Sequence, residues 1–206
     1  MRVRANWRQL DATDMARVAV FAGIVAALGL PGSFTVFGGV PITAQTLGVM
    51  LAGAILGPWL GALSLTVFMA LVAVGLPLLA GGRGGAGVFI GPSGGYCLGF
   101  ILGALVIGAI VHAGGRKPVW WRTLIAMLVG GIAVIYACGI PVQSAVTQLP
   151  LTQTMLASTA FLPGDLTKAV IAVLVVGTLT QAYPRAFRRT WASRAPEPAQ
   201  AAEPVS

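Results

Sequence analysis

The sequence predicts an all-α membrane protein with six transmembrane helices, both termini in the cytoplasm, and a short hairpin and loop lid facing outward. Of its 206 residues, 57% are hydrophobic and 9% are charged, whereas soluble domains carry about 25% charged residues. The mean hydropathy is +0.88, and apolar runs follow one another between Gly- and Pro-rich breaks. A soluble core could not hide so much apolar surface, which excludes a soluble enzyme.

The breaks divide the chain into a cytoplasmic segment at 1–14, a membrane domain at 15–184 and a basic, then disordered, cytoplasmic tail at 185–206. Six helices are predicted over 15–30, 43–57, 59–75, 94–111, 121–136 and 163–183. Several of them fall short of the ~20 residues that cross a bilayer. Because non-helical backbone at membrane depth is tolerated only inside protein or around a polar cavity, the short helices predict a cavity.

Three connections separate these helices. Ser33–Thr43 places β-branched and aromatic residues around Gly38 and Gly39, a pattern that predicts a β-hairpin. Residues 76–95 form a Gly-rich loop. Residues 139–163 are interpreted as a long uncharged connection that is helical only around 152–159.

The positions of the basic residues predict the orientation. The net charge of +8 comes from residues gathered at the two chain ends and in the loop after the fourth helix, namely Arg2, Arg4, Arg8, Arg17, Arg116, Lys117, Arg122, Arg185, Arg188, Arg189 and Arg194. Arg83 stands alone on the opposite side. The positive-inside rule places both termini in the cytoplasm, so the three connections face outward. Clustering beside apolar runs, rather than along a groove, argues against a nucleic-acid partner.

Small residues recur at every fourth position along the first four predicted helices. They are Gly53, Gly57 and Gly61; Gly91, Gly95, Gly99 and Gly103; and, in the first helix, Ala19 with Gly23 and Ala22 with Ala26. Such stripes let helix backbones approach closely. The two glycine stripes are interpreted as internal packing, and the first-helix stripe fits packing and docking of another protein equally well.

Charged groups inside a membrane are costly, and they are hypotheses for a functional site by default. Asp165 is the only carboxylate between Asp14 and Glu197. Lys168 follows it by three residues, which places both on one helix face. The pair is either a structural ion pair or a carboxylate and an ammonium offered to a polar ligand. Arg83 supplies a second cation on the same side.

Three neutral polar residues lie at a similar depth. Tyr96 follows Gly94 and Gly95, and it fits either a ligand contact or an aromatic belt at the membrane interface. Gln45 and Thr43, at the start of the second helix, need hydrogen-bond partners if they are buried. A ligand, or each other, would satisfy them.

Motifs for catalysis are missing from the sequence. It contains no GxxxxGK[ST] phosphate loop, no HExxH and no Ser/His/Asp set on one membrane face, so neither a catalytic residue nor a metal ligand is assigned. Cys97 and Cys138 lie in apolar segments and are predicted to be small buried hydrophobes. The remaining interpretation is an outward-facing pocket for a small polar or anionic ligand, in a chain without an energy source of its own.

Three stretches resemble the BioY family, the biotin-specific substrate component of energy-coupling factor (ECF) transporters. They are VPITAQTLGVMLAGAILGPWLG at 40–61, GLPLLAGGRGGAGVFIGPSGGYCLGF at 75–100 and FLPGDLTK at 161–168. The resemblance covers about residues 15–182. It implies high-affinity binding of biotin from outside a prokaryotic plasma membrane. It also implies two kinds of partner: a transmembrane coupling component and cytosolic ATP-binding cassette subunits that use the ATP. No cofactor of the chain itself is implied.

The resemblance also implies roles for particular residues. FLPGDLTK places Asp165 and Lys168 in the pocket, with the carboxylate suited to the ureido N–H groups of biotin. Lys168 or Arg83 suits the ureido carbonyl or the carboxylate, and the sequence leaves the choice open. Tyr96 and the backbone at Gly94 would wall the ring, and Ser33–Thr43 would be the lid. Substrate components commonly dock through a small-residue surface on the first helix, which Ala19 with Gly23 or Ala22 with Ala26 would supply.

Two other functions compete with this prediction. A substrate component for thiamin or riboflavin would favour more aromatic stacking, and cationic thiamin would favour more acid than one Asp. A membrane scaffold protein without a dedicated ligand would show no saturable binding. An enzyme ranks last because catalytic groups are missing.

Overall fold

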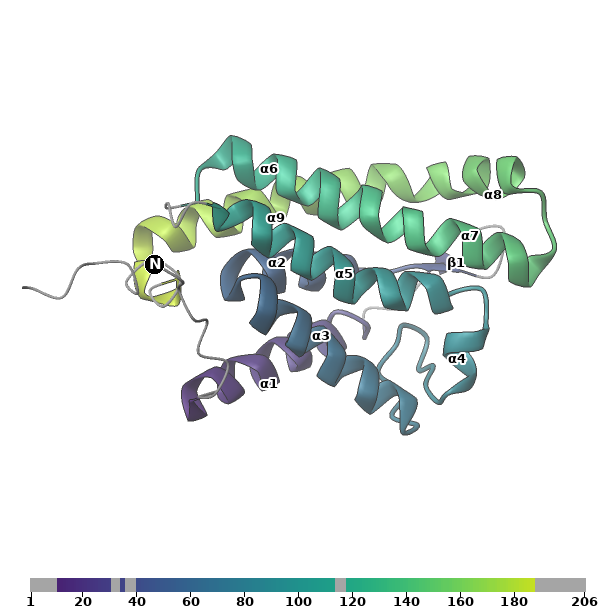
Figure 1. The fold of residues 1–206 in the computed structure, drawn as a ribbon, viewed down its shortest axis with the longest axis horizontal. Helices are drawn as coiled ribbons and strands as arrows, with labels where there is room; N and C mark the ends of the chain where they lie inside the picture. Colours follow the sequence, from purple (N-terminus) through teal and green to yellow (C-terminus); the bar gives the residue numbers. More distant parts are fainter. Residues whose placement is uncertain (1–10, 31–33, 36–39, 114–117, 188–206) are drawn as a thin grey trace, which may run out of the picture.

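The computed structural model describes residues 11–30, 34–35, 40–113 and 118–187. These residues form six helical rods that alternate in direction (Figure 1). The rods are α1 (Ala12–Ala27), α2 (Gln45–Leu56), α3 (Pro58–Ala73), α5 (Gly94–Val111), the run of α6 (Trp120–Leu128), η2 (Val129–Val134) and α7 (Ile135–Thr147), and the run of α8 (Leu151–Ser158), η3 (Thr159–Phe161) and α9 (Leu162–Ala182). The smaller elements are β1 (Phe34–Thr35), β2 (Pro41–Ile42), α4 (Gly87–Ile90) and η4 (Pro184–Phe187).

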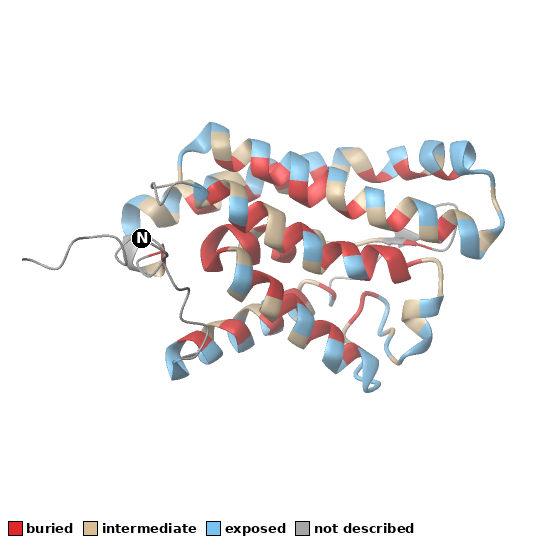
Figure 2. Ribbon diagram, in the orientation of Figure 1, coloured by how far each residue is buried: buried red, intermediate tan, exposed pale blue. Residues whose placement is uncertain are grey.

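Helix α5 lies in the middle of the bundle. It packs against α2 and α3 on one side and against α6, η2 and α7 on the other, while α1 covers α2 and α3 and α9 covers α2 and α6. Buried residues lie on the helix faces that meet one another, and exposed residues lie on the outer faces (Figure 2). The core is therefore continuous around α5.

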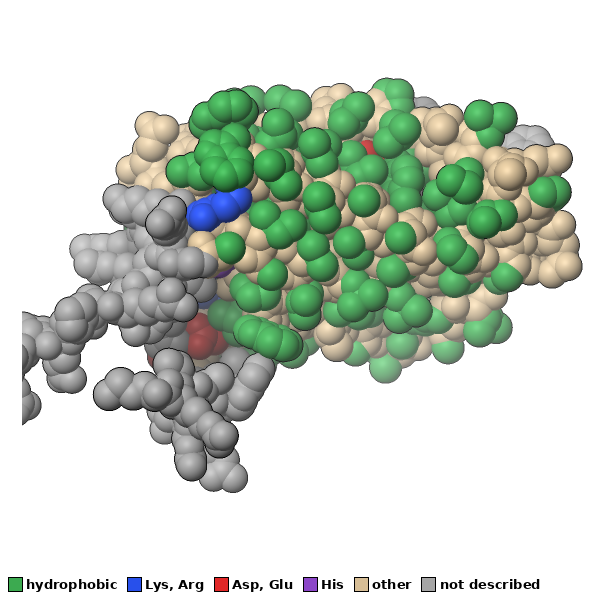
Figure 3. All heavy atoms as spheres, turned by 45° about the horizontal axis from the view of Figure 1, so that its top comes forward, with side chains coloured by type: hydrophobic (Ala, Val, Ile, Leu, Met, Phe, Trp, Pro, Cys, Tyr) green, Lys and Arg blue, Asp and Glu red, His purple; other side chains and the backbone are tan. Residues whose placement is uncertain are grey.

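The outer surface is apolar, as a lipid-facing surface would be. Large hydrophobic side chains such as Trp120 (70% exposed) and Leu174 (64% exposed) project outward, and hydrophobic groups cover most of the face shown in Figure 3. Three helices of the described chain are long and apolar enough to cross a membrane: Gly94–Val111, Trp120–Thr147 and Leu151–Ala182. Shorter apolar helices are Gln45–Leu56 and Pro58–Ala73. The predicted helical membrane class is confirmed at this level.

The glycine stripe on α5 serves close packing, as predicted. A Cβ at Gly99 would lie 2.9 Å from the Ile135 Cα atom, and one at Gly103 would lie 2.7 Å from the Gly130 carbonyl oxygen. These distances are shorter than van der Waals contact, so only glycine lets α5 approach the α6–α7 rod this closely.

The prediction of a long, mostly non-helical connection over 139–163 is wrong. Helix α7 continues to Thr147 and α8 begins at Leu151, so only 148–150 turn the chain, with Gln148 in the left-handed region at φ 57°. Pro141 lies inside α7. Helix α7 packs along α5 and against α8, and this packing holds the helix together across Pro141. Near its C-terminal end, Thr147 Oγ1 donates to the Gln143 backbone oxygen at 2.7 Å. The helical stretch predicted around 152–159 is confirmed as α8.

The hairpin prediction is confirmed where the chain is described. Phe34 pairs with Ile42 and Thr35 with Pro41 in an antiparallel ribbon. Its predicted turn at 38–39 lies outside the described residues, as do the basic residues predicted at 2–8, 116–117 and 188–194.

The two candidate docking pairs on α1 differ in how far they are exposed. Ala22 is only 4% exposed and belongs to the core, and Ala26 is half-buried against the same core. Ala22 and Ala26 therefore face the core of the bundle, which disfavours this pair as a docking face. Ala19 and Gly23 are exposed, and no atom would lie within 4 Å of a Cβ placed at Gly23.

Candidate substrate-binding site

One end of the bundle holds a polar cavity. It lies where the N-terminal ends of α2, α5 and α9 meet α7 and β2, and it encloses about 410 Å³ of empty space that is partly open to solvent. Its lining consists of Val40, Ile42, Thr43, Thr46, Tyr96, Phe100, Ile135, Tyr136, Phe161, Asp165 and Lys168. Like small-molecule pockets, the lining is mostly apolar with a few placed polar groups.

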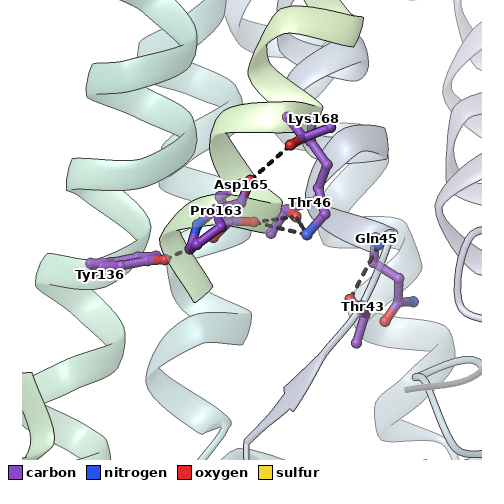
Figure 4. A network of polar contacts seen from close by, with 8 residues as sticks. Thr43, Gln45, Thr46, Tyr136, Pro163, Asp165 and Lys168 are labelled. Carbon is purple, nitrogen blue, oxygen red and sulfur yellow. Dashed lines mark hydrogen bonds and ion pairs between the residues drawn. The ribbon is translucent and has the colours of Figure 1, made fainter. Parts of the chain in front are cut away.

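Asp165 is the centre of the polar groups in this cavity. Its Oδ1 atom lies 2.8 Å from Lys168 Nζ and accepts from Thr46 Oγ1 at 3.1 Å, while Lys168 Nζ also donates to Thr46 Oγ1 at 2.9 Å. Tyr136 Oη donates to the other oxygen, Oδ2, at 2.8 Å. Figure 4 shows these side chains converging from α2, α7 and α9. We call them the Asp165 cluster: Thr46, Tyr136, Asp165 and Lys168.

The Asp165 cluster has hydrogen-bonding positions that its own members do not use. Asp165 is 4% exposed, and its carboxylate offers about four lone-pair sites, three of which the cluster occupies. Lys168 keeps a third N–H donor beside its contacts to Asp165 and Thr46. The cluster can therefore offer one acceptor and one donor, side by side, to a ligand that presents both an N–H group and a carbonyl.

Aromatic rings form the apolar wall next to the cluster. The Tyr96, Tyr136 and Phe161 rings meet edge to face, with centroids 6.3–6.4 Å apart. The Tyr96 hydroxyl donates to Gln143 Oε1 at 2.9 Å and lies 3.3 Å from Ser158 Oγ. Because Tyr96 is 7% exposed, it is a buried wall residue, and the alternative of an interfacial belt tyrosine is wrong.

A second cavity adjoins the first through shared wall residues. Val40, Thr43, Tyr96 and Phe100 line both. The second cavity, about 340 Å³, is completed by Gln45, Leu79, Arg83, Ser93 and Cys97. Arg83 donates from Nη1 to Ser93 Oγ and from Nε to the Ala80 oxygen, each at 3.3 Å. The second cation thus lies on the far side of the shared wall from the Asp165 cluster.

Gln45 is placed in the lining, but its side chain is already bonded to protein. It is 2% exposed; Nε2 donates to the oxygens of Val25 and Leu78 at 3.2 and 3.1 Å, and Oε1 accepts from the Ala80 N–H at 3.3 Å. Its backbone N–H donates to Thr43 Oγ1 at 3.2 Å. Thr43 therefore pairs with the Gln45 backbone, and the Gln45 side chain finds its partners in α1 and the Gly-rich loop instead of in Thr43.

Gly94 lies outside the linings of both cavities. It is the first residue of α5, and a Cβ there would overlap the backbone of Phe89. Glycine at this position therefore lets α4 pack on the start of α5.

Several lining residues were missed in the sequence. Thr46 follows Gln45 directly, and its position on the inner face of α2 could have been inferred from the helix period. Tyr136 lies at the end of the helix predicted over 121–136, so no pattern in the sequence indicates a place in a pocket. Phe161 reaches the cavity only because the α7–α8 turn brings η3 back beside α7, and the sequence does not predict that turn.

Together the fold and the site define a class: a helical membrane protein with a polar cavity between its helix ends. Among the described residues no group of three or more His, Cys, Asp or Glu could hold a metal ion. The lining of the cavity offers hydrogen-bonding groups and aromatic rings.

Comparison with known proteins gives the family. The BioY family model matches residues 1–185. The biotin transporter BioY of Rhodobacter capsulatus is 44% identical over 182 residues, covering 82% of this chain and 94% of the relative. The probable biotin transporter BioY of Bacillus subtilis is 45% identical over 174 residues, covering 84% and 93%. The chain belongs to the BioY family.

A solved structure supports the same assignment. It is the crystal structure of the S-component for biotin from an ECF-type ABC transporter, which superposes with a TM-score of 0.78 at 34% identity and covers 85% of this chain and 96% of that one. The resemblance inferred from the three sequence stretches is confirmed.

Proposed function

We propose that the chain binds biotin from the outer side of a prokaryotic plasma membrane and carries it inward as the substrate component of an ECF-type ABC transporter. The single observation that carries the proposal is the Asp165 cluster, an adjacent acceptor and donor at an aromatic wall, in a member of the BioY family. Family membership favours biotin over thiamin or riboflavin, and a scaffold would not need a ligand-sized polar cavity.

The two ends of biotin match the two cavities. The ureido ring has N–H donors and a carbonyl acceptor, which Asp165 and Lys168 complement. The valerate carboxylate is then assigned to Arg83, because Asp165 already neutralises Lys168 whereas no described carboxylate pairs with Arg83. Arg83 also borders an open hollow of the Gly-rich loop, so its charge is within reach of an incoming anion.

Replacing Arg83 with Met is expected to weaken biotin binding by about ten- to a hundredfold, because a charge-assisted hydrogen bond contributes roughly 1.5–3 kcal/mol. The affinity for biotinamide, which lacks the negative charge, is expected to change by less than threefold. Titration of both ligands against the purified variant measures the difference. Arg122→Met is the matched control, since Arg122 bonds the Ala113 oxygen at the other end of the bundle. An equal loss for both ligands would contradict the assignment of Arg83 to the carboxylate.

Gly139 supports the aromatic wall, and its replacement by Val is expected to lower biotin affinity at least tenfold. A Cβ at Gly139 would overlap the Tyr96 ring, so the ring must move and lose its hydroxyl contacts to Gln143 and Ser158. Binding titration and thermal unfolding measure the two effects. Gly177→Val is the control, because a Cβ at Gly177 meets no atom within 4 Å. Equal behaviour of the two variants would show that the wall is not rigid.

We further propose that all six rods cross the membrane, with both termini in the cytoplasm. The alternating rods and the distribution of Lys and Arg support this topology. The transmembrane coupling component would dock on the exposed Ala19–Gly23 side of α1, and ATP-binding cassette subunits would supply the energy, since the sequence has no phosphate loop.

Uptake of labelled biotin tests the transport proposal. Bacteria without biotin uptake of their own would express the chain alone, or together with coupling and ATPase subunits of an ECF transporter. We expect saturable, ATP-dependent uptake with the full set. A purified chain that binds biotin, but supports no uptake with any such set, would contradict the role as a substrate component.

A further inference from the structure

The Gln45 side chain links its own helix, α2, to helix α1 and to the Gly-rich loop. Nε2 reaches the Val25 oxygen on α1 and the Leu78 oxygen in the Gly-rich loop, and Oε1 holds the Ala80 N–H of the same loop. A neutral amide has two donors, and both are used. A glutamine that is 2% exposed with this set of bonds is a crosslink between backbones.

The loop that Gln45 holds is the one that carries Arg83. Leu79 and Arg83 exchange two backbone hydrogen bonds, at 3.0 and 3.2 Å, and the Arg83 Nε donates to the Ala80 oxygen at 3.3 Å. The turn from Leu79 to Arg83 is thus closed on itself. Because Ala80 is bonded to Gln45, the position of the Arg83 guanidinium depends on Gln45.

The other side of the crosslink is tightly packed against α1. A Cβ at Gly29 would lie 2.9 Å from both Gln45 Nε2 and the Leu78 oxygen, and a Cβ at Gly48 would lie 2.9 Å from Val25 Cγ2. These contacts leave no gap in which a shift could be absorbed. A change in the loop therefore acts on the last turn of α1, the helix that also carries the exposed Ala19 and Gly23.

We propose that Gln45 is a positioning residue that fixes the Arg83 turn against the end of α1, so that occupation of the pocket and the state of α1 are coupled. The inference rests on the proposed function, because biotin is the ligand that would engage Arg83. If biotin stabilises the Arg83 turn, the crosslink also stabilises the turn at 28–30 that follows α1. Any effect of biotin on the affinity of a partner for α1 is then matched by an equal effect of that partner on the affinity for biotin.

Hydrogen exchange of the full chain in detergent, with and without saturating biotin, tests this coupling. The amides of Leu28, Gly29 and Leu30, which bond to carbonyls of α1, are expected to exchange about fivefold more slowly with biotin. In Gln45→Leu the ratio is expected to fall to about one while labelled biotin still binds at saturation. Biotin bound to the unaltered chain without slower exchange at 28–30 would overturn the inference.

Two further variants make the result specific. Gln143→Leu removes another buried glutamine, which lies on α7 and accepts from the Tyr96 hydroxyl of the pocket wall; it is expected to weaken biotin binding and to keep the protection at 28–30 once saturated. Gly29→Ala adds a Cβ that would lie 2.9 Å from Gln45 Nε2, and we expect it to reduce the protection at 28–30. This variant supplies a second test if Gln45→Leu fails to fold. Full protection in either Gln45→Leu or Gly29→Ala contradicts the inference. Failure of the unaltered chain to bind biotin would instead contradict the proposed function.

Discussion

Replacing Asp165 with Asn is expected to weaken biotin binding by about a hundredfold. The amide presents one acceptor and one donor where the carboxylate presents only acceptors, so at least one ureido N–H loses its partner. Hydrogen bonds to charged groups contribute roughly 1.5–3 kcal/mol, and Lys168 is left without its counter-charge 2.8 Å away. Equilibrium titration of labelled biotin against the purified variant measures the effect.

The control for this experiment is the other buried carboxylate in the described part of the chain. Asp14 is 7% exposed and lies on α1 at the opposite end of the bundle. Asp14→Asn is expected to leave biotin affinity within about twofold of the unaltered chain. Thermal unfolding without biotin separates loss of the site from loss of the fold. A folded Asp165→Asn variant with unchanged affinity would assign the Asp165 cluster a purely structural role.

Replacing Gly23 with Leu is expected to abolish biotin uptake while leaving biotin binding within about twofold. The side chain would extend from α1 into open space, where it disturbs no contact within the bundle but prevents close approach of a partner helix. Binding is measured on the purified chain, and uptake is measured in cells that also express the coupling and ATPase subunits.

Gly177→Leu is the matched control for Gly23→Leu. Gly177 lies on α9, and a Cβ there also meets no atom within 4 Å, so the same substitution is made on a different face. We expect this variant to transport biotin normally. Uptake that survives in Gly23→Leu would place the docking surface elsewhere, without affecting the proposed substrate.

The positions of the apolar helices could be predicted because lipid imposes them. Apolar runs closed by Gly or Pro gave α2, α3 and α5 to within two or three residues. The α7–α8 region could not be predicted in the same way. Pro141 favours a break in any isolated helix, and it is the packing of α7 along α5 that keeps the helix intact, a tertiary effect that local pattern does not contain.

The site was predicted in part for a related reason. Asp165, Lys168 and Arg83 are conspicuous in an apolar chain, and Tyr96 and Thr43 lie beside recognisable turns; all five line the cavities. Tyr136 and Phe161 are ordinary aromatic residues in sequence. They become wall residues only because the α6–α7 rod and α9 bring them to the same carboxylate, and no spacing along the chain indicates that.

Gln45 shows the opposite case, a residue that the sequence marks as important for the wrong reason. A glutamine in an apolar helix needs partners, and a ligand was one candidate. The structure supplies backbone partners from α1 and from the Gly-rich loop. Which partner a buried amide finds depends on chain segments 20 to 35 residues away in sequence.

The most direct test is equilibrium binding of labelled biotin to the detergent-purified chain alone, with thiamin and riboflavin as competitors. We predict saturable binding with one site per chain, displaced by unlabelled biotin and by neither of the other vitamins. Absence of saturable biotin binding by a chain shown to be folded, or displacement of biotin by thiamin or riboflavin, would contradict the proposal that the cavity between the Asp165 cluster and Arg83 is a biotin site.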